Sequence, residues 1–254
     1  MTRTKIVAGN WKMNTTLDEA RDLAAAIASG ASASEGVELA VFPPFPWIVP
    51  VYAALGGSSI QVGAQDCYTQ KSGAFTGEVS PWSLAGICQM ILAGHSERRH
   101  VIGESDELVG QKVDATLAAG LTSVLCVGEL LDERQAGEAQ TVVTRQLEAG
   151  LATVAGALLA RLVTPYDPVW AIGTGVAAPP ADAHEMCAAI RGWMVSRYAD
   201  AGDSVRVLYG GSVTPENAVE LFEQPDVDGG LVGGASLKAD SFLAIAAAAA
   251  TGGV

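Results

Sequence analysis

The 254-residue sequence has few cationic residues and few cysteines. Fifteen Lys and Arg stand against 28 Asp and Glu, a net charge of −13, so no basic face for nucleic acid or for an anionic membrane is expected. The four cysteines, Cys67, Cys88, Cys126 and Cys187, show no C-x-x-C spacing, which favours reduced packing residues over disulfides or metal ligands. A cytoplasmic protein without a bound metal is therefore expected.

Long apolar runs and interdomain linkers are also missing. No apolar run reaches the roughly 18 residues that a membrane span needs, and residues 1–4 lead directly into a strand-like segment, so no signal peptide is expected. No Ser/Pro/Gly-rich or charge-rich stretch divides the chain, which is 49% hydrophobic and 17% charged. This composition predicts one domain over residues 1–254 with a large core.

Strand-like and helix-like segments alternate along the chain. The predicted strands are residues 5–11, 37–42, 60–65, 89–93, 122–127, 161–166, 205–209 and 230–232. Helices are predicted from residue 17, over 46–55, near 82, over 105–119, 141–159 and 181–198, from Thr214-Pro215, and in the Ala-rich final segment. Because the strands are apolar throughout, they are expected to be buried on both faces, which indicates an α/β fold, a single-domain (β/α)₈ barrel. A doubly wound open sheet is the alternative, but no G-x-G-x-x-G follows the first strand.

Polar residues follow two of the early strands. In a barrel of this kind the active site gathers at the carboxyl ends of the strands. The first strand ends in Asn10-Trp11-Lys12; such a lysine is usually solvated, but after an apolar strand it can point into the barrel mouth and hold an anion. His95 follows the fourth strand beside a glycine and a helix start, whose N–H groups would keep the ring neutral and able to donate a hydrogen bond to a carbonyl oxygen.

An aspartate stands where the sixth strand meets a loop. Pro168 biases Asp167 toward an extended conformation, while Gly173 and Gly175 give the following segment conformational freedom. A loop with a rigid first part and a mobile tip is typical of a lid that closes over a ligand. The alternative is an ordinary Asp-Pro turn followed by an apolar loop.

Paired glycines follow the last two strands. Gly210-Gly211-Ser212 and Gly233-Gly234 each lead toward a helix. Each pair alone indicates only a tight turn, but two pairs at these strand ends match the usual phosphate site of the barrel class. Backbone N–H groups would then bind phosphate in a protein of strongly negative charge.

Five motifs together resemble the triosephosphate isomerase family in order and spacing, and the resemblance covers essentially the whole chain. They are Asn-Trp-Lys-Met-Asn, Gly-His-Ser-Glu-Arg-Arg, Pro-Val-Trp-Ala-Ile-Gly-Thr-Gly, Tyr-Gly-Gly-Ser and Leu-Val-Gly-Gly-Ala-Ser-Leu-Lys. The resemblance implies reversible conversion of D-glyceraldehyde 3-phosphate to dihydroxyacetone phosphate through an enediolate, in glycolysis and gluconeogenesis, without cofactor or metal. It also implies a homodimer in which the loop around Phe75 and Thr76 inserts into the partner subunit near Lys12.

The resemblance also implies roles for individual residues. The implied catalytic residues are His95, Asp167, Lys12 and Glu97. The implied substrate-binding residues are Asn10, Lys12, Gly173, Ser212, Gly233 and Gly234.

The chain departs from the family pattern at the base itself. Asp167 stands where the family has glutamate, so its carboxylate is drawn back by about 1.5 Å, and a misplacement of about 1 Å can cost roughly a hundredfold in rate. Thr164-Pro165 is a second departure; the proline cannot donate to the sheet, and it either carries Asp167 forward or damages the strand end. A natural and an engineered origin of Asp167 both stay open. The alternatives to a slow triosephosphate isomerase are an isomerase of a four-carbon phosphorylated keto-sugar and a non-catalytic barrel paralogue.

Overall fold

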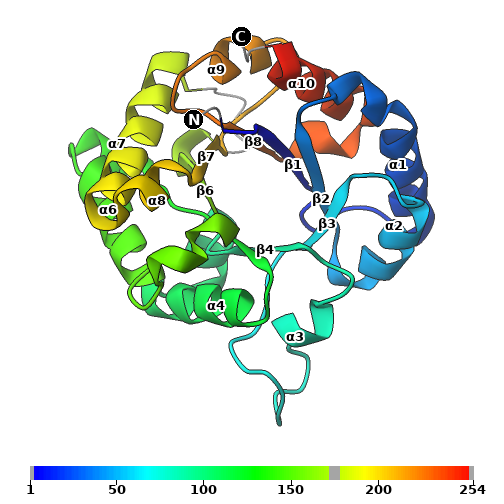
Figure 1. The fold of residues 1–254 in the computed structure, drawn as a ribbon, viewed down its shortest axis with the longest axis horizontal. Coiled ribbons are helices and arrows are strands. Elements are labelled where there is room, and N and C mark those ends of the chain that lie inside the picture. Colours follow the sequence, from blue (N-terminus) through cyan, green and yellow to red (C-terminus); the bar gives the residue numbers. More distant parts are fainter. Residues whose placement is uncertain (1–2, 172–177, 252–254) are drawn as a thin grey trace.

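The computed structural model describes residues 3–171 and 178–251. Eight parallel strands close into a barrel in sequence order, with helices forming an outer ring (Figure 1). The strands are β1 Ile6–Asn10, β2 Glu38–Phe42, β3 Gln61–Ala64, β4 Met90–Ala93, β5 Thr122–Leu125, β6 Leu162–Tyr166, β7 Arg206–Tyr209 and β8 Gly229–Val232. All eight predicted strands and the predicted (β/α)₈ barrel are confirmed.

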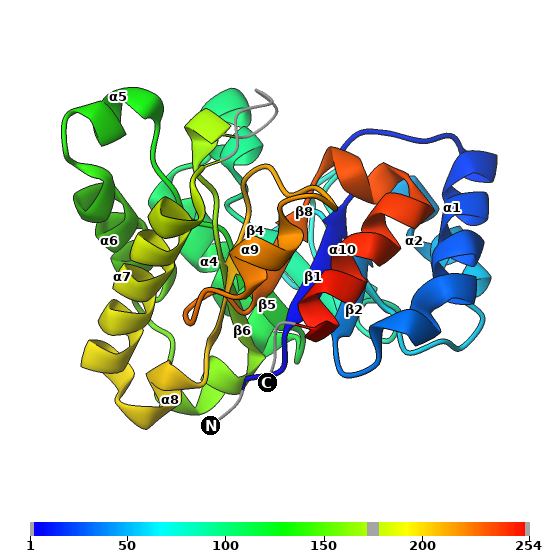
Figure 2. The same cartoon turned by 90° about the horizontal axis from the view of Figure 1, so that it is seen from above.

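The helices surround the strands on all sides, with α6 and α7 across the barrel from α1 and α2 (Figure 2). The α-helices are α1 Leu17–Gly30, α2 Ile48–Ala54, α3 Pro81–Leu84, α4 Asp106–Ala118, α5 Leu131–Gln135, α6 Ala139–Gly150, α7 Pro180–Tyr198, α8 Asp200–Asp203, α9 Ala218–Phe222 and α10 Ala239–Thr251. Short 3₁₀ or π turns are η1 Ala31–Ser34, η2 Phe45–Trp47, η3 Arg98–Ile102, η4 Gly156–Arg161, η5 Val169–Ala171 and η6 Gly234–Leu237. Among the described residues, no helix has both the length and the apolarity of a membrane span.

Helix starts follow local capping chemistry. Ser105 accepts a hydrogen bond from the Leu108 N–H at the start of α4, as the sequence predicted. Thr16 and Glu19 form a reciprocal capping box at the start of α1. These side chains satisfy N–H groups that the first helical turn leaves without a partner.

Two predicted helix boundaries are wrong. The helix predicted over 141–159 ends at Gly150, where a Cβ would lie 2.8 Å from Leu125 Cδ2, and the chain continues into a separate turn, η4. The helix predicted to start at Thr214-Pro215 begins later, at Ala218 in α9, because residues 215–217 form a turn; the Asn217 side chain accepts from the Thr214 N–H within it. The short helix α5 was not predicted.

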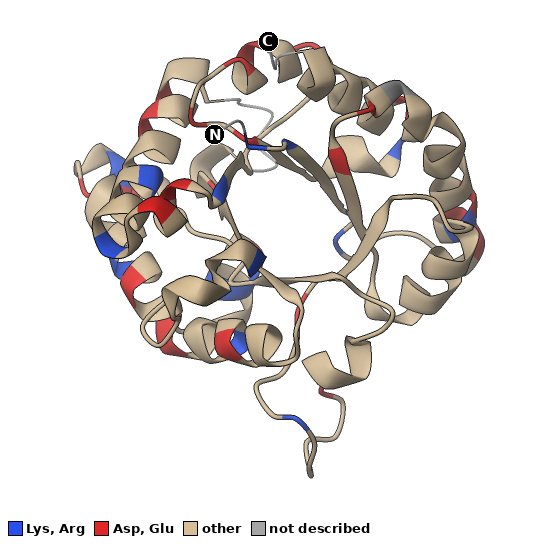
Figure 3. Ribbon diagram, viewed as in Figure 1, with Lys and Arg blue, Asp and Glu red and all other residues tan. Residues whose placement is uncertain are grey.

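The core has two layers, which explains strands that are apolar on both faces. The barrel interior is filled by Ile6, Ala8, Ala40, Phe42, Met90, Leu92, Val124, Cys126, Val163, Leu208 and Leu231. A larger cluster fills the space between strands and helices. Charged residues lie mostly on the helices and their connections (Figure 3), and all four cysteines are buried and free.

Neighbouring strands of the barrel share different numbers of register pairs. β1 shares five register pairs with β2, whereas β7 and β8 share one. The β5–β6 ladder pairs Val124 with Val163, is interrupted at Pro165, and resumes with Val127 opposite Tyr166 at the same offset. Pro165 therefore removes an N–H donor without shifting the strand, and it does not carry Asp167 forward.

Candidate active site

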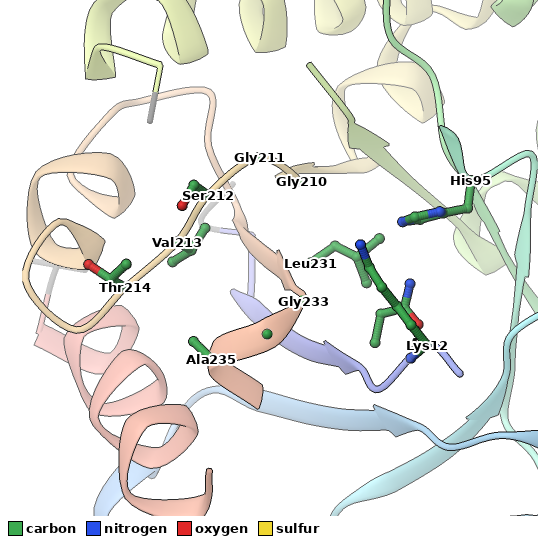
Figure 4. Close-up of a pocket in the computed structure, with 12 residues that line it drawn as sticks. Lys12, His95, Gly210, Gly211, Ser212, Val213, Thr214, Leu231, Gly233 and Ala235 are labelled. Carbon is green, nitrogen blue, oxygen red and sulfur yellow. Dashed lines mark hydrogen bonds between the residues drawn. The ribbon is translucent and has the colours of Figure 1, made fainter. Parts of the chain in front are cut away.

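One cavity of about 250 Å³ opens at the carboxyl ends of β1, β4, β7 and β8 (Figure 4). Its lining residues are Asn10, Lys12, His95, Gly210, Gly211, Ser212, Val213, Thr214, Leu231, Gly233, Gly234 and Ala235. Six of the residues predicted for the site therefore meet in one place. The segment containing Gly173 lies outside the described residues.

Lys12 is held on a backbone of unusual conformation. Its φ is 52°, a region that side chains other than glycine seldom adopt. The Lys12 N–H donates to Asn10 Oδ1 at 3.0 Å, and the Lys12 carbonyl accepts from the Gln65 side chain at 2.8 Å. Its ammonium Nζ lies 2.7 Å from Glu97 Oε1. These contacts hold a positive charge at the cavity, as the sequence predicted, with Glu97 beside it.

His95 extends from the end of β4 into the cavity, facing Lys12 (Figure 4). The Glu97 backbone N–H donates to His95 Nδ1 at 3.3 Å. Nδ1 therefore acts as an acceptor, and a neutral ring carries its proton on Nε2. The predicted helix-start N–H is present, and it selects the tautomer that can donate a hydrogen bond from Nε2.

Asp167 lies behind the cavity wall. The residue is 1% exposed and does not line the cavity. Its Oδ2 atom is 3.5 Å from the Ser96 N–H nitrogen and 3.8 Å from His95 Nε2, while Oδ1 has no hydrogen-bond partner among the described residues. Burial raises the pKa of the Asp167 carboxyl; His95, the Ser96 N–H, Lys12 and Arg99 oppose that rise. The carboxylate is thus close to His95 but withdrawn from the cavity.

Two glycines give Asp167 its space. A Cβ on Gly210 would lie 2.0 Å from Asp167 Oδ1, and a Cβ on Gly128 would lie 1.8 Å from the Asp167 carbonyl oxygen. Any side chain at either position would displace Asp167. From the sequence, Gly210 was predicted only to form part of a phosphate-binding turn, and Gly128 was given no role.

The opposite wall is mainly backbone. Gly211 and Ser212 follow β7, and Gly233 and Gly234 follow β8, where η6 begins. A Cβ on Gly233 would lie 3.6 Å from Lys12 Cε, which places this wall next to the lysine. Bare backbone allows an anion to approach peptide N–H groups closely, so this wall suits a phosphate.

Buried Glu129 anchors the start of the loop after β6. Its Oε1 accepts from the Tyr166 hydroxyl at 2.9 Å and from the Trp170 indole N–H at 2.9 Å. Arg134 lies 3.3 Å from the same oxygen, stacks over Trp170, and pairs with Asp182 on α7 at 2.6 Å. Glu129 and Arg134 were not predicted as functional residues, because several of their partners are distant in the chain.

The far end of the same loop is also tied to the barrel. The Ala178 N–H donates to the Tyr209 hydroxyl at 3.3 Å. Burial raises the pKa of Tyr209 to about 12, so the hydroxyl keeps its proton at neutral pH. The predicted lid tip, with Gly173 and Gly175, lies outside the described residues, whereas the contacts at both ends of the loop are described.

Comparison with known proteins agrees with this geometry. A family model described as triosephosphate isomerase matches residues 5–249. The chain is 49% identical to the triosephosphate isomerase of Roseiflexus sp. (strain RS-1), over 96% of each chain. It is 50% identical to that of Dechloromonas aromatica (strain RCB) over 97% of this chain and 99% of the relative, and 51% identical to that of Thiobacillus denitrificans over 98% and 99%. On these matches, the chain belongs to the triosephosphate isomerase family.

Proposed function

We propose that the chain interconverts D-glyceraldehyde 3-phosphate and dihydroxyacetone phosphate through an enediolate, in glycolysis and gluconeogenesis, without a cofactor or metal. The observation that carries the proposal is the 3.8 Å approach of His95 Nε2 to Asp167 Oδ2 at one side of a cavity whose other wall is glycine backbone. The relatives' names favour this substrate over a four-carbon keto-sugar phosphate, and favour an enzyme over a non-catalytic barrel.

In the proposed mechanism Asp167, His95, Lys12 and Glu97 have separate roles. The Asp167 carboxylate removes a proton from the carbon beside the substrate carbonyl. The Lys12 ammonium and the His95 Nε2–H then stabilise the enediolate oxygens. His95 gives its Nε2 proton to the former carbonyl oxygen and takes the hydroxyl proton from the other oxygen, and Asp167 returns its proton to the neighbouring carbon. Glu97 is proposed as a further catalytic residue, because it holds the Lys12 ammonium at 2.7 Å and lies beside His95.

Substrate binding is proposed for the residues around the cavity mouth. These are Asn10, Lys12, Gly173, Ser212, Gly233 and Gly234. The glycine wall accounts for phosphate binding by a chain of charge −13, because peptide N–H groups rather than a cationic patch receive the anion.

Turnover is proposed to be slow because the base is aspartate. The carboxylate is 1% exposed and stands behind the cavity wall, and the unshifted register of β6 gives it no forward movement. In the proposed reaction Asp167 must reach a substrate carbon in the cavity, and a shorter side chain makes that approach less frequent.

Steady-state isomerisation of glyceraldehyde 3-phosphate tests the proposal. We expect Asp167→Glu to raise kcat at least about tenfold at similar KM, because one methylene restores the reach of the base. Asp167→Asn is the control that keeps the shape and removes the basic group. Absence of triose isomerisation in both the unmodified protein and Asp167→Glu would refute the proposal.

A homodimer is also proposed. Residues 70–78 are exposed in a loop that projects from the barrel beside α3 (Figure 1). Beside Lys12, a groove of about 530 Å³ includes Met13, Val101 and Ile102, which are 95%, 78% and 63% exposed. Exposed apolar residues gathered at one groove favour a protein contact, and the projecting loop of a second copy, carrying Phe75, suits it.

Analytical ultracentrifugation tests the dimer. Phe75→Asp should convert a dimer to a monomer, whereas Val49→Asp, an exposed apolar residue on α2, is a matched control for the added charge. A monomeric unmodified protein would contradict the proposal. Cytoplasmic location and one domain over residues 1–254 are proposed from family membership, and are tested by cell fractionation and by a single cooperative unfolding transition.

A further inference from the structure

A buried arginine lies directly behind the candidate site. Arg99, in η3, is 8% exposed. Its Nε donates to the Gly94 carbonyl at 2.8 Å and its NH2 group donates to the Cys126 carbonyl at 3.1 Å. Gly94 has a φ of 71°, and a Cβ there would lie 2.7 Å from the Arg99 NH2 group, so the chain leaves room for the guanidinium.

The two carbonyls that Arg99 holds belong to the ends of the adjacent strands β4 and β5, which lie on one side of β6 and of Asp167 after it. Gly94 precedes His95 at the end of β4. Cys126 precedes Val127, whose carbonyl accepts from the Asp167 N–H at 2.7 Å. The planar guanidinium of Arg99 thus connects two peptides near the site. One is Gly94, next to His95, and the other is Cys126, next to the residue whose carbonyl accepts from the Asp167 N–H.

The charge of Arg99 is only partly balanced. Its NH1 group pairs with Asp106 Oδ1 at 2.5 Å, but Asp106 Oδ2 also pairs with Arg145 at 3.1 Å, so one carboxylate serves two guanidinium groups. A buried positive charge in this position acts on nearby ionisable groups through a medium less polar than water.

Ionisable groups from several elements face Asp167. They are His95 at the end of β4, Lys12 at the end of β1, Arg99 in η3 and the Cys126 thiol after β5, whose pKa is raised by burial. Glu97 lies next to Lys12 and His95, and it balances part of the Lys12 charge. Arg99 is the one cation in this set that is paired away from the cavity.

We propose that Arg99 is a positioning residue for Asp167: its fork fixes the ends of β4 and β5 beside β6, which Asp167 follows, and its buried positive charge favours the ionised form of that carboxylate. This inference goes beyond the proposed function and rests on it only in taking Asp167 as the base. Asp167 Oδ1 has no hydrogen-bond partner among the described residues, and the ionised carboxylate is favoured by His95, the Ser96 N–H, Lys12 and Arg99.

The test measures the ionisation of Asp167 with and without the charge. Arg99→Met should move the acid limb of the pH profile of kcat to higher pH by about half a unit or more, equal to at least about threefold higher proton affinity. Arg99→Lys should leave the limb near its original pH but lower kcat, because charge is kept and the fork is lost. Asp106→Asn should move the limb to lower pH, because it frees the charge of Arg99.

The matched control is Arg21→Met, which removes an equal charge from the exposed face of α1. The same substrate is used throughout, so its own titration is common to all variants. An acid limb that stays at one pH in Arg99→Met and Asp106→Asn would overturn the proposal, as would equal shifts in Arg99→Met and Arg21→Met.

A second measurement does not need activity. Infrared difference spectra between the free protein and Asp167→Asn, recorded as a function of pH, report the carbonyl band of the protonated Asp167 carboxyl. That band should appear at higher pH in Arg99→Met than in the unmodified protein, and an unchanged titration would refute the inference even for a protein that isomerises no triose. Conversely, a shifted band without isomerisation would refute the proposed function alone.

Discussion

Two buried aspartates at opposite ends of the barrel differ in how many hydrogen-bond donors surround their carboxylates. Asp228 stands just before β8 and is 5% exposed; its Oδ1 accepts from Arg3 and its Oδ2 from Arg191 and from the Val207 N–H, all at 2.6–2.9 Å. Asp167, at the other end, has a 3.5 Å contact to the Ser96 N–H and an oxygen without a partner among the described residues.

The number of donors decides whether a buried carboxylate stabilises the fold or can act as a base. A buried carboxylate with a full set of donors is held in one place and keeps its charge. A buried carboxylate with an incomplete set costs folding energy, but it stays basic and free to accept a proton. The amino end of this barrel therefore carries the first arrangement, and the carboxyl end, where the cavity lies, carries the second.

The largest expected effect is the loss of activity in Asp167→Asn. If Asp167 is the base, kcat should fall about 10²- to 10⁴-fold, the usual contribution of a positioned acid or base. Steady-state kinetics with glyceraldehyde 3-phosphate measures it, with circular dichroism to show that the fold is intact. A kcat within threefold of the unmodified value would remove Asp167 from the mechanism.

The complementary effect is a loss of stability in Asp228→Ala. The change leaves Arg191 buried without one of its partners, so the free energy of unfolding should drop by about 3–5 kcal/mol while kcat per folded molecule stays the same. Urea unfolding measures the drop. Asp203→Ala is the control: Asp203 also pairs with Arg3 but its side chain is 52% exposed, so about 1 kcal/mol or less is expected.

A smaller effect is expected when Gly210, which lies next to the Asp167 carboxylate, is changed. Gly210→Ala places a methyl group where Asp167 Oδ1 now lies, so the carboxylate must move and kcat should fall about a hundredfold. Gly192→Ala, in the middle of α7, is the control, because a Cβ there meets open space among the described residues. Full activity in Gly210→Ala would show that the carboxylate position does not limit the reaction.

The smallest effect concerns pH. Burial raises the pKa of Asp167 above that of the unfolded chain, so the stability linked to this group is complete below the unfolded value and is lost as pH rises through the folded value. Asp167→Asn should therefore raise Tm near pH 8, and the gain should shrink as pH falls toward about 4. Asp18→Asn on the exposed face of α1 is the charge-matched control, and an equal gain at every pH would contradict the assignment.

The sequence predicted the strands and most of the cavity for one physical reason. Strands buried on both faces are continuous apolar runs, and the residues directly after them must gather at one end of a barrel. Lys12, His95 and Ser212 were found in this way. The positions follow from local pattern alone.

The unpredicted parts depend on register between strands. Gly128 supports Asp167, and Arg99 holds Cys126, only because neighbouring strands place them opposite each other. The withdrawal of Asp167 behind the wall similarly depends on β7, where the Gly210 N–H donates to the Tyr166 carbonyl at 2.7 Å. Periodicity within one segment carries no information on such pairings.

Because β7 and β8 share a single register pair, Asp228 also helps to hold these two strands together. Its Oδ2 accepts the Val207 N–H in the place where a longer β8 would offer a backbone carbonyl, so a side chain completes the seam. Barrel closure there depends on ion pairs with Arg3 and Arg191 rather than on an extended ladder. In native-state hydrogen exchange, amides that bridge β7 and β8 should therefore exchange before amides that bridge β1 and β2, because the barrel should open at this seam first.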